Sequence, residues 1–249
     1  MPDASRTAAG AAPGRALLRL PGPLRRRFDG CLFGCAPEPA PEPPAVVIRR
    51  RRVVAGTAVL AVVLLALTML ARPGSTAFYP LALALAATYL AGGLLSGRLR
   101  LRAARQEGRG GRALGAPLLA GMLAYAFFAL AAWAVQVVPP IDHAVQGALH
   151  RADAGPRWLI LAVAVLTGLG EEVYFRGALF AALGRRSPVV LSTLAYVAVT
   201  IATRNVSLVL AAAVMGLLWA LERRASGGVL ASGITHITWS ILMIFLIPR

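Results

Sequence analysis

The chain has 249 residues, 58% of them hydrophobic and 14% charged, with a formal net charge of +16 and a mean hydropathy of +0.69. An ordinary soluble domain is roughly 45–50% apolar and about 25% charged, so this composition excludes that class and indicates a membrane protein with several spans. The positive charge does not indicate a nucleic-acid partner, because the arginines cluster at the ends of apolar runs, as they do in proteins that orient themselves in a bilayer.

The N-terminal residues 1–48 are rich in Pro, Ala, Gly and Arg, and residues 36–45 read APEPAPEPPA. Such a segment cannot bury enough apolar surface to fold alone, so we expect a disordered cytoplasmic arm. It contains both cysteines of the chain, Cys31 and Cys35. Without a second pair or a nearby histidine, they are expected to be reduced thiols rather than metal ligands.

From residue 53 on, apolar runs alternate with short polar breaks. Most runs approach the ~20 residues that a helix needs to cross ~30 Å of hydrocarbon, so the predicted fold is an all-α, polytopic transmembrane helix bundle of about seven spans. The fifth and sixth runs are only about 16 residues long, and we expect them to sit inside the bundle or to form a re-entrant pair. The seven runs are 53–71, 77–95, 114–138, 158–183, 188–203, 206–221 and 228–247.

Arginine clusters fall on one side of this arrangement. They comprise Arg49–Arg52, the six arginines Arg98, Arg100, Arg102, Arg105, Arg109 and Arg112, and the pairs Arg185–Arg186 and Arg223–Arg224. The other side receives a thinner set, Arg72, Arg151, Arg157, Arg204 and Arg249. Cytoplasmic loops carry the excess of basic residues, so the N-terminus is predicted inside and the C-terminus outside. We expect a multi-pass protein of the bacterial plasma membrane, in contact with the lipid bilayer.

The fourth run contains three ionisable residues within the stretch LTGLGEEVYFRGALF. Each charge costs about 2.5–3.5 kcal/mol at the centre of a membrane helix, so the three must be compensated or functional. Glu172 and Arg176 are spaced i,i+4 with the acid first, which favours an ion pair on one helix face. Glu171 is rotated by ~100° from that face, so it is predicted to remain available toward a cavity as a general base. A buried ion pair that only locks helix packing is the alternative.

The last run carries the second polar feature, in the stretch GITHITWS. His236 is the only histidine inside an apolar run, and Ser240 lies one turn beyond it on the same helix face. Together with the acidic pair, His236 is predicted to share a polar pocket inside the bundle. His143 and His150 lie on an outside connection that reads as an interfacial helix, and we expect them to be exposed.

The stretches EEVYFRG and HITWS resemble the first and last motifs, EExxxR and HxxxN, of a family of intramembrane endopeptidases. This is the CAAX-processing and bacteriocin-processing family, abbreviated CPBP or Abi, which includes the type II CAAX prenyl proteases. The resemblance covers residues from Trp158 to the C-terminus. It implies hydrolysis of a peptide bond in a peptide or protein substrate, prenylated or not.

The resemblance also implies residue roles. Glu171 corresponds to the glutamate that activates a water, Glu172 and Arg176 to its companions, and His236 to the histidine that binds or polarises the reacting carbonyl. The cofactor stays open between a divalent metal such as zinc, held by Glu171 and His236 if by any residues, and none, if Glu171 activates water alone. A catalytic zinc usually has three protein ligands, so two such residues weaken the metal-dependent version.

Two positions depart from the family pattern. The middle motif FxxxH falls at YVAVT, where Tyr196 replaces the phenylalanine and Thr200 stands in place of the histidine. Ser240 replaces the asparagine of the last motif. Thr200 cannot act as a base near neutral pH, and it is expected to bond the carbonyl one turn back in its own helix. Tyr196, Thr200 and Ser240 are therefore candidates for supporting roles only.

The leading hypothesis is thus an intramembrane endopeptidase organised in three parts. Residues 1–48 form the arm, residues 49–155 the N-terminal transmembrane helices, and residues 156–249 a catalytic-type helix bundle. The first alternative is a catalytically degenerate scaffold or regulator, because Thr200 replaces the middle histidine. The second is a transporter or proton relay, since intramembrane carboxylates also mark ion pathways, although no inverted repeat supports it.

Overall fold

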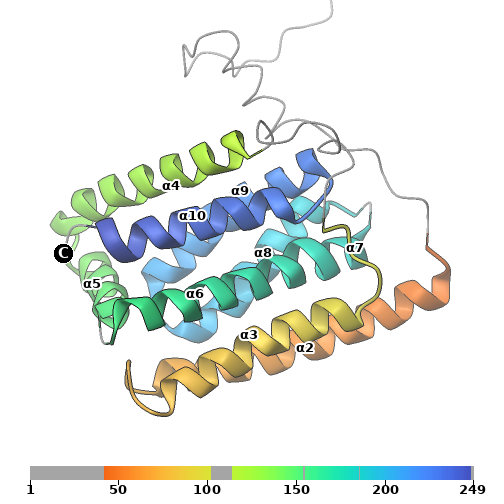
Figure 1. Ribbon diagram of the computed structural model, residues 1–249, viewed down its shortest axis with the longest axis horizontal. Helices are drawn as coiled ribbons and strands as arrows, with labels where there is room; N and C mark the ends of the chain where they lie inside the picture. The colour runs from red at the N-terminus through yellow and green to blue at the C-terminus, as the bar shows by residue number, and fades with distance from the viewer. Residues whose placement is uncertain (1–41, 102–113, 154, 185, 248–249) are drawn as a thin grey trace, which may run out of the picture.

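The computed structural model describes residues 42–101, 114–153, 155–184 and 186–247, and every regular element in these ranges is helical (Figure 1). The N-terminal helices are α2 (Pro44–Leu70), α3 (Phe78–Leu95), α4 (Gly115–Ala134) and α5 (Pro139–Asp153). The C-terminal helices are α6 (Arg157–Glu171), the π-helical segment η3 (Glu172–Leu179), α7 (Phe180–Leu183), α8 (Pro188–Thr200), α9 (Val206–Ser226) and α10 (Leu230–Leu246). The predicted all-α class is confirmed.

Five helical segments are long and apolar enough to cross a membrane: Pro44–Leu70, Phe78–Leu95, Gly115–Val137, Arg157–Leu183 and Val206–Ser226. Two shorter apolar segments, Pro188–Thr203 and Leu230–Leu246, coincide with the predicted fifth and seventh spans. Among the described residues, the hydropathy pattern therefore located the five long and two short apolar helices, and the chain is an integral membrane protein. The sixth predicted span was too short, because α9 continues through Glu222 and Arg223 to Ser226. Both of those side chains are buried with partners, so the helix gains rather than loses by continuing.

The helices form a row with a second layer behind it. In Figure 1 the row runs from α2 and α3 through α6 and α10 to α4, and successive members pack against one another. Helices α8 and α9 form an antiparallel hairpin behind the row, and α9 also packs on α10. Helix α6, with its extension η3, therefore occupies the centre and contacts elements on both sides.

Close approach between neighbouring helices depends on glycine. A Cβ at Gly92 of α3 would collide with the Thr57 side chain of α2, and one at Gly121 of α4 would lie 2.9 Å from the Thr235 carbonyl oxygen of α10. Small residues at crossing points let helix backbones pack without a hydrophobic driving force from water. These contacts set how closely α3 packs on α2 and α4 packs on α10.

The first helix begins earlier than predicted. Proline at its first position sets φ for a helix, and the Arg49–Arg52 run continues as helix rather than preceding it. Residues 44–48 are thus part of α2, so the predicted boundary of the arm at residue 48 was too late. Residues 1–41, including Cys31 and Cys35, lie outside the described residues, as do Arg102, Arg105, Arg109, Arg112, Arg185 and Arg249.

The arginine run ties three helix ends together. Arg50 is fully buried, pairs with the Glu42 carboxylate at 2.6 Å and donates to the Arg98 carbonyl at 3.3 Å. Arg49 donates to the Leu95 carbonyl at 3.0 Å and Arg51 to the Ala182 carbonyl at 3.2 Å. The last carbonyls of a helix have no intrahelical partner, so these guanidinium groups satisfy the C-terminal ends of α3 and α7.

The connection between the third and fourth apolar runs forms the helix that the sequence predicted. Helix α5 has acid in its first turn and histidine and arginine in its last turn, the order that the helix dipole favours. His143 and His150 are both exposed, as expected.

Candidate active site

The acidic segment changes helix type at the glutamates. Helix α6 ends at Glu171 and continues as π-helix from Glu172 to Leu179, a conformation that is rare and often found at functional sites. A wider helical turn alters the angle between successive side chains and disturbs the usual backbone bonding. The Arg176 carbonyl accepts a hydrogen bond of 2.7 Å from Nε of Arg223, which lies on α9. A buried arginine from a neighbouring helix therefore supports the irregular segment.

Glu172 is the centre of a buried charged trio. Its Oε1 lies 3.3 Å from Nη1 of Arg176 and 3.4 Å from Nδ1 of His236. Glu172 and Arg176 are fully buried and His236 is 6% exposed. The i,i+4 ion pair predicted from the spacing is present, and His236 approaches the same oxygen from α10. The Oε2 atom of Glu172 is buried and has no described hydrogen-bond partner.

Arg176 is held by aromatic faces as well as by Glu172. Its Cζ lies 4.9 Å from the ring centroid of Tyr196 and 5.0 Å from that of Trp219. Its Nη2 donates to the Gly216 carbonyl at 3.1 Å. Cation–π contacts of a desolvated guanidinium are worth about 2 kcal/mol, so the ring faces of α8 and α9 help to offset the cost of burying this charge.

His236 is fixed in orientation. Its ring stacks on the Trp219 indole with centroids 3.8 Å apart and an interplanar angle of 18°. On α6, a Cβ at Gly168 would lie only 3.2 Å from Cε1 and Nε2 of the same ring. The lack of a side chain at Gly168 therefore lets the imidazole pack closely against α6, while Nδ1 faces Glu172.

Glu171 is held by a different partner from the members of this trio. The Tyr196 hydroxyl donates to its Oε2 at 2.8 Å, and the side chain is half-buried where Glu172 is completely enclosed. Tyr196 also faces the Arg176 guanidinium, so one tyrosine links the two glutamates. The sequence pointed to Tyr196 only as a replaced motif residue, and its contact with Glu171 depends on the packing of α8 against η3.

The two other supporting candidates have plainer surroundings. Thr200 donates to the Tyr196 carbonyl at 2.8 Å, the bond to its own helix that was predicted, and the prediction is confirmed. Ser240 is buried one turn beyond His236 on α10.

A third buried acid was missed by the sequence reasoning. Glu222 on α9 is 3% exposed, its Oε1 accepts a 2.7 Å hydrogen bond from the Thr235 hydroxyl, and its Oε2 is buried without a described partner. Thr235 immediately precedes His236, so the contact links the end of α9 to the histidine-bearing helix. The available signal was that Glu222 is the only acidic residue after Glu172.

The donor set does not match a protein-ligated catalytic metal. Within the described ranges, no group of three or more His, Cys, Asp or Glu side chains is arranged to hold an ion. Catalytic zinc sites usually use three protein ligands. The residues present, Glu171 and His236 among them, therefore do not fit a resident zinc ion.

Comparison with known proteins gives one match. Residues 153–242 match the family described as type II CAAX prenyl endopeptidase, Rce1-like. No curated protein and no solved structure matches the chain significantly. The matched region spans α6 to α10 and contains every residue of the cluster described above.

Proposed function

We propose that the protein is an intramembrane endopeptidase in which Glu171 activates water, because residues 153–242 match the family of type II CAAX prenyl endopeptidases. The observation that supports this proposal is that the two glutamates differ in burial and in their partners. Glu172 is enclosed between Arg176 and His236, whereas Glu171 is half-buried and held only by the Tyr196 hydroxyl. A general base needs an orienting partner and access to its water. The Tyr196 hydroxyl would orient Glu171, and the partial exposure of this side chain would admit the water.

The buried trio positions the electrophilic group. A hydrogen bond between Nδ1–H of His236 and Glu172 fixes the imidazole, which leaves Nε2 on the side of the ring that faces Gly168. When Nε2 carries a proton, it donates to the carbonyl oxygen of the scissile peptide bond. Hydrogen-bond donors that are already in place stabilise a developing oxyanion strongly in a site that excludes water.

The proposed steps balance without another reactant. Glu171 removes a proton from water, and the hydroxide oxygen forms a bond to the scissile carbonyl carbon. The resulting oxyanion is stabilised by His236. When the intermediate collapses, the carbon–nitrogen bond breaks and the proton held by Glu171 passes to the leaving amine. No step uses a metal ion, because the donor set does not fit one.

A catalytically degenerate scaffold or regulator is the second candidate. It is favoured by Thr200, whose hydroxyl is occupied by the Tyr196 carbonyl at the position of the family's middle histidine. The substrate class would be the same, a membrane-associated peptide tail, bound without cleavage.

One experiment separates these candidates. The protein is reconstituted in liposomes with two fluorescence-quenched peptides that end in a CAAX sequence, one farnesylated on its cysteine and one not. We expect cleavage by the wild type, at least 100-fold slower cleavage by Glu171→Gln, and a partial loss in Tyr196→Phe, since proton transfer by a positioned side chain contributes 10²–10⁴-fold. Thr200→Ser, which keeps the hydroxyl, is the matched control.

Two results would contradict the proposal. Cleavage by Glu171→Gln at the wild-type rate removes Glu171 as the base. Binding of the peptides by a wild type that never cleaves them establishes the scaffold instead. Preference for the farnesylated peptide would extend the proposal to prenylated substrates.

A further inference from the structure

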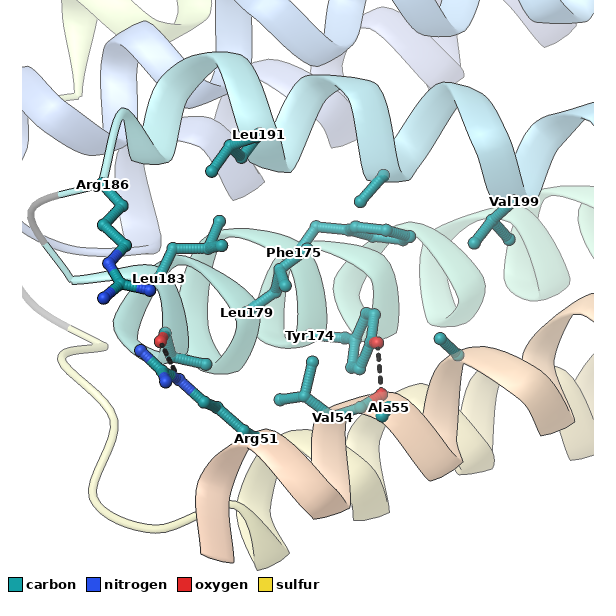
Figure 2. A pocket seen from close by; sticks show the side chains of 13 residues that line it. Arg51, Val54, Ala55, Tyr174, Phe175, Leu179, Leu183, Arg186, Leu191 and Val199 are labelled. Atoms are coloured by element: carbon teal, nitrogen blue, oxygen red, sulfur yellow. Dashed lines mark hydrogen bonds between the residues drawn. The ribbon is translucent and has the colours of Figure 1, made fainter. Parts of the chain in front are cut away.

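A cavity lies between α2, η3 and α8. It has a volume of about 430 Å³ and is enclosed by α2, η3, α7 and α8 (Figure 2). Phe175 lines it, and the same ring meets Tyr196 with centroids 4.8 Å apart, so Phe175 separates this groove from the Glu171 site. The groove is therefore not the proposed peptide-binding site.

The walls of the groove are apolar along its length. Figure 2 shows Val54, Phe175, Leu179 and Val199 facing its interior. Among the lining residues the only hydroxyl is that of Tyr174, and it donates to the Val54 carbonyl at 2.7 Å. From Leu191 to Val199 the helix rise gives a length of about 12 Å. Such walls suit a hydrocarbon chain and offer nothing to a polar occupant.

One end of the groove is strongly cationic. Arg51 of α2 and Arg186 of the α7–α8 turn both line this end, as Figure 2 shows, and both are exposed. Only Nε of Arg51 is used within the described structure, by the Ala182 carbonyl, so its terminal nitrogens remain for a ligand. No described carboxylate lies within ion-pair distance of either guanidinium.

The Arg186 position is built into the turn. Gly184 and Ser187 adopt left-handed conformations with φ of 58° and 47°, and the Arg186 amide donates to the Leu183 carbonyl at 3.3 Å. This backbone path folds the turn back over the end of α7, where Arg51 also binds. Two arginines from segments far apart in the sequence thus meet above one apolar groove.

We infer that this groove binds an anionic glycerophospholipid, with its phosphate between Arg51 and Arg186 and an acyl chain along Val54, Leu179 and Val199. Charge complementarity selects the headgroup, because guanidinium groups bind phosphate through paired hydrogen bonds and no described acid competes. The arginines lie at the membrane face that the basic clusters assign to the cytoplasm, where anionic headgroups attract basic residues. The bound lipid would brace α2 against α8 beside the π-helical segment.

Native mass spectrometry of the full chain in mild detergent tests this inference. The protein is titrated with phosphatidylglycerol and, separately, with phosphatidylcholine of identical acyl chains. We expect the wild type to retain phosphatidylglycerol preferentially, and Arg51→Gln/Arg186→Gln to lower its apparent affinity about tenfold, to the level of phosphatidylcholine. Arg52→Gln is the matched control, because Arg52 is exposed in the same run but does not line the groove.

A steric variant tests the groove itself. Ala55 lines the groove and is exposed on α2, so Ala55→Phe fills space without displacing core side chains, and retention of both lipids should fall. Equal retention of the two lipids by the wild type would overturn the inference, as would a loss in Arg52→Gln as large as in the double variant. None of these measurements involves cleavage, so their outcome is independent of the proposed protease activity.

Discussion

At the scale of residues, the site is distinguished by the different burial and different partners of two adjacent glutamates. Glu172 shares its Oε1 between Arg176 and His236 and is fully enclosed, whereas Glu171 is half-buried and bonded to Tyr196. Because the charges of Glu172 and Arg176 offset one another, the segment can be tolerated in a bilayer, and Glu171 is left without an ion-pair partner among the described residues. The two acids therefore belong to different environments although they are neighbours in the chain.

Gly168 allows a direct test of the histidine position. In Gly168→Ala the new Cβ would lie 3.2 Å from Nε2 of His236, closer than an ordinary contact, so the ring should shift by a few tenths of an ångström. We expect peptide cleavage to slow by about tenfold or more, because small displacements of reacting groups are costly. The rate with the farnesylated peptide measures this effect. Gly56→Ala on α2, where a Cβ would meet nothing within 4 Å, should leave the rate unchanged.

The Glu172–Arg176 pair predicts a stability effect that depends on both partners. Arg176→Met leaves the Glu172 carboxylate buried without its ion-pair partner, which is expected to destabilise the protein by about 3–5 kcal/mol. Thermal unfolding in detergent measures the loss. The double variant Glu172→Gln/Arg176→Met should recover part of it, since the uncompensated charge is then absent. Equal destabilisation of the single and double variants would show that the ion pair is not the cause.

The residue pattern could be read from the sequence only within one helix. The i,i+4 spacing predicted the contact of Glu172 with Arg176, and a hydroxyl bond one turn back was predicted for Thr200. Contacts between helices were predicted only in outline, since His236 was expected to share a pocket with the acidic pair but its partner atom was not specified. The approach of His236 to Glu172 and of Tyr196 to Glu171 depends on how α8 and α10 pack against η3, which spacing does not encode.

At the scale of elements, the π-helical segment is the feature that sequence periodicity could not predict. The residues of this segment fit an ordinary apolar helix pattern, so the sequence gives no sign of the change in helix type. In the structure the segment is π-helical, and its Arg176 carbonyl accepts a hydrogen bond from Arg223. The sequence analysis placed the same arginine just after the sixth apolar run, on the predicted cytoplasmic side. In the structure it lies in the last turn of α9 and is 9% exposed, with its guanidinium over the Phe180 ring at 5.1 Å.

Arg223 should therefore be needed for the local structure of η3. Arg223→Gln removes the Nε donor from the buried Arg176 carbonyl, and an unsatisfied buried group costs about 1–3 kcal/mol. Hydrogen–deuterium exchange should show faster exchange in residues 172–179. Arg224→Gln, the adjacent residue, is the matched control because Nε of Arg224 has no described hydrogen-bond partner. If both variants exchange alike, the support of η3 by Arg223 is refuted.

At the scale of the whole molecule, hydropathy located the seven apolar helices but not their arrangement. Length and composition determine which segments suit a bilayer, and those predictions held for the five long and two short helices. The row of α2, α3, α6, α10 and α4, with α8 and α9 behind it, depends on glycine contacts and on buried polar pairs between helices. Neither is visible in a plot of hydrophobicity along the chain.

The orientation of the bundle remains a prediction from the arginine clusters, with the N-terminus in the cytoplasm and the C-terminus outside. This orientation can be tested with single cysteines at position 98 or position 146. Both variants are made in a background in which Cys31 and Cys35 are replaced by serine. In intact cells a membrane-impermeant thiol reagent should label the cysteine at position 146 on α5 and not the one at position 98. Labelling of position 98 alone would reverse the assignment.

The arginine run at the start of α2 has a consequence for how the protein is made. Its charges are the signal expected to retain the first helix end in the cytoplasm during insertion, yet Arg49, Arg50 and Arg51 later bind the ends of α3 and α7. These partners are synthesised after the run, up to 131 residues further along the chain in the case of Ala182. The same side chains thus act first on the bilayer and then on the finished bundle. A substitution among these arginines can therefore act at two stages. It can invert the first helix during insertion, or it can remove hydrogen bonds between helix ends in a correctly inserted bundle.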